Sequence, residues 1–289
     1  MRLTRRDRIL LFAPATVLIA GGLLLPAVLG LTATFTTYSP FSPAVRFSGL
    51  SNYAAVLGDH LFAAAVRNII VFTVFAVPLE LLIGFGLAYV LWRPIRGRRL
   101  WRVLLLMPWL VSPIANGVMW HFLFGSTRGI VDFAVGSVRQ PDLPSPIGDV
   151  RLALAATIAV EVWRISPLVT FLLLPGLSSI PPERWEDAIL NGASWIRTVL
   201  HVALPSMRPL LLATTMLLIG LSLGTFDSVL ILTGGGPGTS TITPALYSYS
   251  QAFSANDWPA GGASAWLIAA DVLGVGLVYL RLVPTRPIG

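Results

Sequence analysis

The sequence contains no cysteine and no lysine, and charged residues of either sign are scarce. Without cysteine the chain has no disulfide bond and no thiolate metal ligand. Its three histidines, His60, His121 and His201, lack the spacing of metal ligands, so we expect no metal site. Without lysine the chain cannot form the glycine-rich phosphate loop that ends in Gly-Lys-Ser or Gly-Lys-Thr. We therefore expect that it does not hydrolyse ATP itself.

Apolar residues dominate what is present. Hydrophobic side chains make up 55% of the 289 residues and charged ones 11%, and the mean hydropathy is +0.78. Soluble domains carry about 25% charged residues. The net charge of +7 would suit nucleic acid, but the 20 basic residues, all arginine, are dispersed between hydrophobic runs. The composition excludes a water-soluble globular enzyme and predicts a polytopic membrane protein that contacts the lipid bilayer and no nucleic acid.

Six apolar segments are each long enough to cross about 30 Å of hydrocarbon as a helix. They are residues 9–35, 69–92, 100–124, 152–177, 210–232 and 263–280. The basic start of the chain resembles a signal peptide, but the apolar stretch that follows is too long and has no cleavage site. We interpret it as a retained helix. The predicted fold is all-α, with six transmembrane helices in a single domain over residues 1–289.

The distribution of arginine predicts the orientation in the membrane. If the N-terminus is cytoplasmic, the cytoplasmic segments hold 14 arginines and the opposite loops hold 5, with Arg164 inside a span. Cytoplasmic loops of membrane proteins carry the excess of basic residues. We therefore expect both termini in the cytoplasm.

The loop between the fourth and fifth spans, residues 180–208, carries signals for two helices. Pro181 and Pro182 favour a first turn, acidic residues follow, and Gly192 stands where a left-handed residue would end the helix. A second helix is predicted to start at Ser194 as N-cap and to end where Pro205 breaks it. Amphipathic helices also lie on lipid surfaces, but those favour basic polar faces. Because the first helix is acidic, we expect it to dock on a protein.

One spacing within this loop is highly specific. Its residues are Glu186, Asp187 and Ala188, then Gly192 after three residues, Val202 after nine more, and Leu204-Pro205 after one more. The pattern resembles the EAA loop of ABC-importer permeases, and it departs from the family pattern only by Asp187 for alanine and Val202 for isoleucine. The segments 47–53, 107–109 with Trp120, and 232–237 resemble the maltose-type sugar-permease branch in the same order.

The resemblance, which covers nearly the whole chain, implies the fold of type I importer permeases and a location in the bacterial inner membrane. It implies that the EAA loop inserts into a cytoplasmic ATPase dimer, which hydrolyses ATP with Mg²⁺, and that this chain binds no cofactor directly. The ATPase-coupling residues would be Glu186, Asp187, Ala188, Gly192, Leu204 and Pro205. The other implied partners are a second homologous permease and an extracytoplasmic binding protein, expected to be a lipoprotein. The cargo would be a sugar or a related polyol.

Ionisable residues inside the spans are functional candidates, because a charge in the bilayer is costly. Glu161 and Arg164 are three residues apart on one helical face, so we expect them to form an ion pair. Glu80 follows Pro78, and we expect it to bond a neighbouring helix. An ion-coupled secondary transporter that relays protons through Glu80, Glu161 or Asp271 is the alternative, although no inverted repeat is evident.

The fifth span contains the best candidates for the substrate pathway. In the family that the sequence resembles, this stretch lines the pore, and a carboxylate, hydroxyl or aromatic ring there can contact a sugar. The candidates are Thr225, Phe226, Asp227 and Ser228, together with Asn116 on the third span. For Asp227 a hydrogen bond between helices explains the residue equally well. Asn116 and His121 also fit such a bond, which single polar residues in membrane helices often form.

Overall fold

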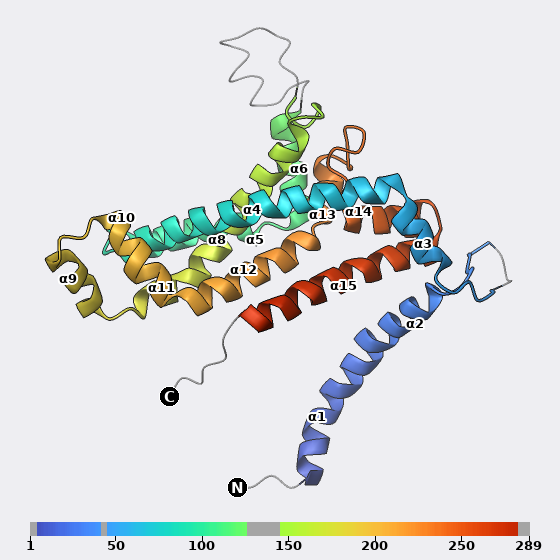
Figure 1. Ribbon diagram of the computed structural model, residues 1–289, viewed down its shortest axis with the longest axis horizontal. Coiled ribbons are helices and arrows are strands. Elements are labelled where there is room, and N and C mark those ends of the chain that lie inside the picture. The colour runs from blue at the N-terminus through green and yellow to red at the C-terminus, as the bar shows by residue number, and fades with distance from the viewer. Residues whose placement is uncertain (1–4, 42–44, 126–144, 283–289) are drawn as a thin grey trace. The chain divides into compact units, whose positions relative to one another are not determined.

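A computed structural model describes residues 5–41, 45–125 and 145–282. Within these ranges the chain is helical apart from its connections, and the only strand-like pairing is a single bridge between Thr36 and Phe47. The chain divides into two compact units, one formed by residues 1–63 and 247–267 and the other by residues 64–246 and 268–289. Figure 1 labels the helices of both units.

The first unit contains three N-terminal elements, α1 (Arg5–Ile19), the π-helical turn η1 (Ala20–Leu24) and α2 (Leu25–Ala33). The other elements in it are α3 (Ser51–Gly58), the start of α4 (His60–Trp92), the end of α14 (Pro244–Tyr249), η3 (Ser250–Ser254) and the start of α15 (Trp258–Leu282). Asn52 joins α3 to the end of α2, since its side-chain amide donates to the carbonyl oxygens of Thr34 (2.7 Å) and Thr36 (3.0 Å). The hydroxyl of Tyr247 donates to Asp59 at 2.7 Å and closes the unit.

The second unit holds the rest of α4 and the helices that follow it. They are α5 (Arg98–Leu110), α6 (Pro113–Phe124), α8 (Ala153–Ser178), α9 (Pro182–Leu190), α10 (Trp195–Thr198), η2 (Val199–Ala203), α11 (Leu204–Ser206), α12 (Arg208–Leu223) and α13 (Asp227–Leu232). Helices α5 and α12 pack against α8, and α13 packs against α6. More than half of the residues of α8 are buried, including Val169 and Leu173, so this helix is the centre of the unit.

Four helices in the described residues are long and apolar enough to span a membrane, and the number rises to six if each of two bent pairs is one span. The predicted third span is such a pair, because α5 and α6 meet at 91°. Pro113 opens α6, and the hydroxyl of Ser112 caps it by accepting from the Ala115 amide at 3.2 Å. The chain starts a new helix at this proline, which cannot supply an amide to the preceding turn.

The predicted fifth span is also interrupted, between the end of α12 at Leu223 and the start of α13 at Asp227. Pro205, in contrast, does not end the second loop helix as expected. The helix passes through Pro205 to Ser206 after the π-helical turn η2, and the 79° bend to α12 comes at Met207. The wider π turn changes the hydrogen-bond pattern just ahead of the proline, and this accommodates a residue without an amide hydrogen.

Candidate functional site

Helix α9 and the turn after it form as the sequence predicts. Pro182 occupies the first turn and Glu183 lies at the helix start. The turn after the helix contains Gly192, whose φ is +71°. The amide of Ala193 donates to the carbonyl of Ala188 at 3.0 Å and closes this turn. Glycine takes this left-handed conformation without strain. The hydroxyl of Ser194 then caps the next helix by accepting from the Arg197 amide at 3.4 Å.

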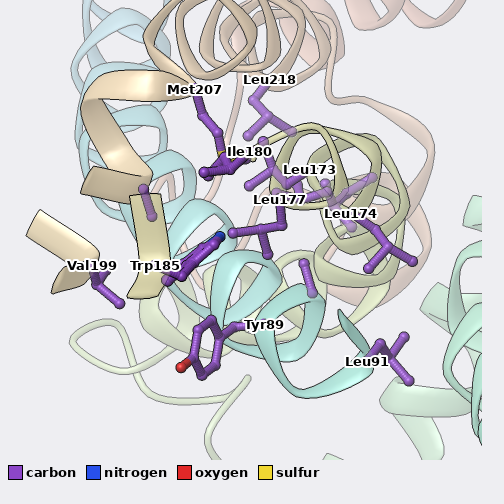
Figure 2. Packing of buried hydrophobic residues seen from close by; sticks show 14 of the residues in the cluster. Tyr89, Leu91, Leu173, Leu174, Leu177, Ile180, Trp185, Val199, Met207 and Leu218 are labelled. Atoms are coloured by element: carbon purple, nitrogen blue, oxygen red, sulfur yellow. The ribbon is translucent and has the colours of Figure 1, made fainter. Parts of the chain in front are cut away.

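Aromatic stacking anchors α9 to the end of α4. Trp185 is the buried residue of α9, and its ring stacks on Trp92 with 4.8 Å between centroids. The ring centroid of Tyr89 lies 6.4 Å from that of Trp185 and 5.6 Å from that of Trp195, so Tyr89 contacts both loop helices. These side chains continue into the main hydrophobic cluster, in which Figure 2 shows Trp185 and Tyr89 with Leu177 of α8. The loop therefore packs directly on α4 and α8.

Apart from Trp185 and the partly buried Ala188, the residues of α9 are exposed. Ile189 and Leu190 expose 69% and 84% of their surface, and Glu186 and Asp187 are exposed beside them. Such a group of apolar side chains with a polar border is typical of a protein docking surface. The helix presents one face to its own bundle and the other outward.

A cleft of about 410 Å³ separates α9 from the second loop helix. Asp187, Ala188 and Pro205 line this cleft, which Arg184 crosses by donating to the hydroxyl of Ser206 at 3.2 Å. Leu204 instead packs against the main hydrophobic cluster. The structure thus brings the predicted coupling residues into one loop, with Glu186 outward, Gly192 at the turn and Leu204 at the base.

The break between α12 and α13 places the predicted pathway residues at one point. Thr225 and Ser228 are buried, and the carbonyl of Thr225 accepts a hydrogen bond from the Thr243 hydroxyl at 3.0 Å. Asp227 is exposed in the first turn of α13, and Phe226 next to it is half-buried. Unwound backbone inside a membrane protein is tolerated where it is packed against protein or lines a cavity.

Asn116 lies on α6, the helix that packs against α13. It is fully buried, and neither its amide nitrogen nor its amide oxygen has a hydrogen-bond partner among the residues that the structure describes. Gly117 allows the close approach of the two helices, since a Cβ there would lie 2.9 Å from the Cβ of Ile231. His121 joins them through Nδ1, which lies 2.8 Å from the carbonyl of Leu232.

The other ionisable candidates inside the predicted spans are Glu80, Glu161, Arg164 and Asp271. Arg164 Nη2 lies 2.5 Å from Glu161 Oε1, which confirms the predicted ion pair. Glu80 on α4 is also buried, with 1% of its surface exposed. Asp271 is exposed on α15. A buried ion pair within one helix, Glu161 with Arg164, is consistent with a structural role.

Four to six helices apolar enough to span a membrane, counted in the described residues, define an integral membrane protein. The model of the family described as binding-protein-dependent transport system inner membrane component matches residues 80–284, and the chain belongs to this family. Members are permease components of the inner membrane and have no ATPase site of their own. The family name itself states that transport depends on a binding protein.

Curated relatives cover most of the chain. A probable ABC transporter permease of Pyrococcus horikoshii is 29% identical, over 94% of both chains. The trehalose/maltose transport permease of Thermococcus litoralis is 30% identical, over 84% of this chain and 81% of its own. The sulfoquinovosyl glycerol transport permease of Agrobacterium fabrum is 30% identical, over 96% and 90%. A bacterial alginate ABC transporter, crystallised with its alginate-bound periplasmic protein, has the same fold, with a TM-score of 0.81 at 16% identity over 95% of this chain and 93% of that one.

Proposed function

We propose that the chain is the transmembrane subunit of an ATP-driven importer and forms half of the translocation pathway for a sugar or a related polyol. The cargo class is supported by relatives whose names specify trehalose and maltose or sulfoquinovosyl glycerol. The single observation that carries the coupling role is α9, which is anchored by the buried Trp185 on one face and exposes Leu190 on the other.

The partners in this proposal are a second permease, an ATPase dimer and a separate extracytoplasmic binding protein. ATP and Mg²⁺ belong to the ATPase subunits. The open face of α9 sits in a cleft of one ATPase, and movement of that cleft pulls on Trp185. Because Trp185 stacks on Trp92 and Tyr89 at the end of α4, the displacement passes into a spanning helix without a flexible link.

The same proposal assigns a membrane orientation and a pathway. The arginine distribution supports cytoplasmic termini, which put α9 on the side of the ATPase. Thr225, Phe226, Asp227 and Ser228 at the break after α12 supply polar and aromatic groups to the cargo. Asn116, whose buried amide has no hydrogen-bond partner among the described residues, is the further candidate on the neighbouring α6.

Cross-linking from single cysteines tests the coupling role, because the natural chain has no cysteine. Leu190→Cys is placed on the open face of α9 and should cross-link to the ATPase subunit in the assembled complex. Leu50→Cys, also well exposed but in a loop assigned to the outer side, is the matched control and should react only with impermeant reagents added outside. Labelling of Leu190→Cys from outside, without a cross-link, would refute both the orientation and the coupling role.

A further inference from the structure

An apolar groove of about 820 Å³ runs along α4, α5 and α8 within the second unit. Its lining includes Phe75, Leu79 and Ile83 of α4, Leu104 of α5, and Ile158 and Val162 of α8. Its volume is within the range of about 300–1,000 Å³ that is usual for small-molecule sites. None of the proposed coupling or pathway residues lines this groove.

A smaller polar pocket of about 380 Å³ continues the groove at one end. Val71, Arg151 and Leu154 line both, so the two spaces adjoin each other. The polar part adds the guanidinium of Arg67 and the loop that contains Ser240. Together they are therefore apolar over most of their length and basic at one end.

The Arg67 guanidinium has only a neutral hydrogen-bond partner among the described residues, the side-chain oxygen of Asn68 at 3.5 Å. Among the described residues neither Arg67 nor Arg151 forms an ion pair, and the nearby Asp149 accepts instead from the backbone amide of Arg151 at 2.7 Å. The loop is fixed in place by Asn68, whose amide donates to the carbonyls of residues 239 and 242 at 2.7 and 3.0 Å. The hydroxyl of Ser240 is buried and has no hydrogen-bond partner in the described part of the chain.

We propose that this space binds an anionic phospholipid, with the phosphate between Arg67 and Arg151 and an acyl chain in the groove. Guanidinium groups bind phosphate oxygens in a fork-like geometry, and the Ser240 hydroxyl is a further donor. A soluble anion would use only the polar pocket, and a helix of the second permease would use only the groove. An anionic lipid is the occupant that uses both. In the proposed orientation both arginines are on the outer side, where membrane proteins carry fewer basic residues, and a lipid phosphate gives them a counter-charge.

Lipid titration of the purified full-length chain, followed by native mass spectrometry, tests the proposal. Phosphatidylglycerol should bind at least about tenfold more tightly than phosphatidylcholine with the same acyl chains, and Arg67→Gln with Arg151→Gln should remove that preference. Arg46→Gln is the matched control, because Arg46 is exposed on the same proposed side but lies outside both pockets. Ala159→Phe should weaken lipid binding by filling the groove that Ala159 lines.

Three results would overturn the proposal. Equal binding of the two lipids, or an equal loss of phosphatidylglycerol binding in Arg46→Gln, would remove the role of the arginine pair. Displacement of the lipid by millimolar inorganic phosphate, with no effect of Ala159→Phe, would indicate a site for a soluble anion. Loss of phosphatidylglycerol when the second permease joins the complex would show that a protein helix occupies the groove.

Discussion

Replacement of Gly192 tests whether the turn after α9 matters through its backbone conformation. Gly192 has a φ of +71°, and a Cβ built there meets nothing within 4 Å. The penalty of a side chain is therefore conformational and not steric. A left-handed L-residue costs roughly 1–2 kcal/mol, which lowers the population of the correct turn by about five- to thirtyfold. Valine is at the upper end because it is β-branched, and asparagine tolerates this region better.

Gly192→Val should lower ATP-driven uptake by about five- to thirtyfold in proteoliposomes that contain the assembled transporter, whereas Gly192→Asn should retain most of it. Gly97→Val is the matched control, since Gly97 has a φ of +73° and equally open space but lies before α5, outside the coupling loop. It should lower thermal stability while the ratio of uptake to ATP hydrolysis stays unchanged. If asparagine at position 192 were as harmful as valine, the turn would matter through side-chain volume against a partner, and the backbone argument would be refuted.

Three other substitutions probe the anchor, the pathway and the helix contact. Trp185→Ala removes the ring that stacks on Trp92, costs roughly 3–5 kcal/mol if the site does not collapse, and should expose the loop to limited proteolysis and abolish coupling. Asp227→Asn should weaken the apparent affinity for cargo about tenfold if the carboxylate contacts it, and an unchanged uptake curve with lowered thermal stability would reject that role. Gly117→Val pushes a side chain into Ile231, 2.9 Å from the added Cβ, and should lower stability by roughly 1–3 kcal/mol in thermal unfolding; an unchanged midpoint would contradict the close packing of α6 and α13.

The sequence predicts the helical fold and the helix–turn–helix form of residues 180–208 well, because both depend on local signals. Long apolar runs specify the spanning helices, and the spacing from Glu186 to Pro205 marks the loop. The proline pair 181–182 and the single Gly192 also mark the start and end of α9. These features depend on residues that are close in sequence, so they can be predicted without knowledge of tertiary contacts.

Bends and burial were not predictable in the same way. The 91° bend before Pro113 and the break before Asp227 lie inside continuous apolar runs, and a hydropathy pattern does not separate a straight span from a broken one. Pro205 was expected to end a helix, but a π turn formed ahead of it. The close approach of α4 to α8 at Gly84, where an added Cβ would lie 2.5 Å from Val169, joins residues that are far apart in sequence, and no local pattern indicates it.

The central claim is that this chain works only as part of an ATP-driven complex. Uptake of labelled sugars and polyols into sealed vesicles tests it directly, with the chain alone or with its second permease, ATPase and binding protein. The account predicts uptake only when all the partners and ATP are present, and uptake that persists when a protonophore collapses the proton gradient. Uptake by the chain alone that stops with the protonophore would contradict the account and indicate an ion-coupled secondary transporter.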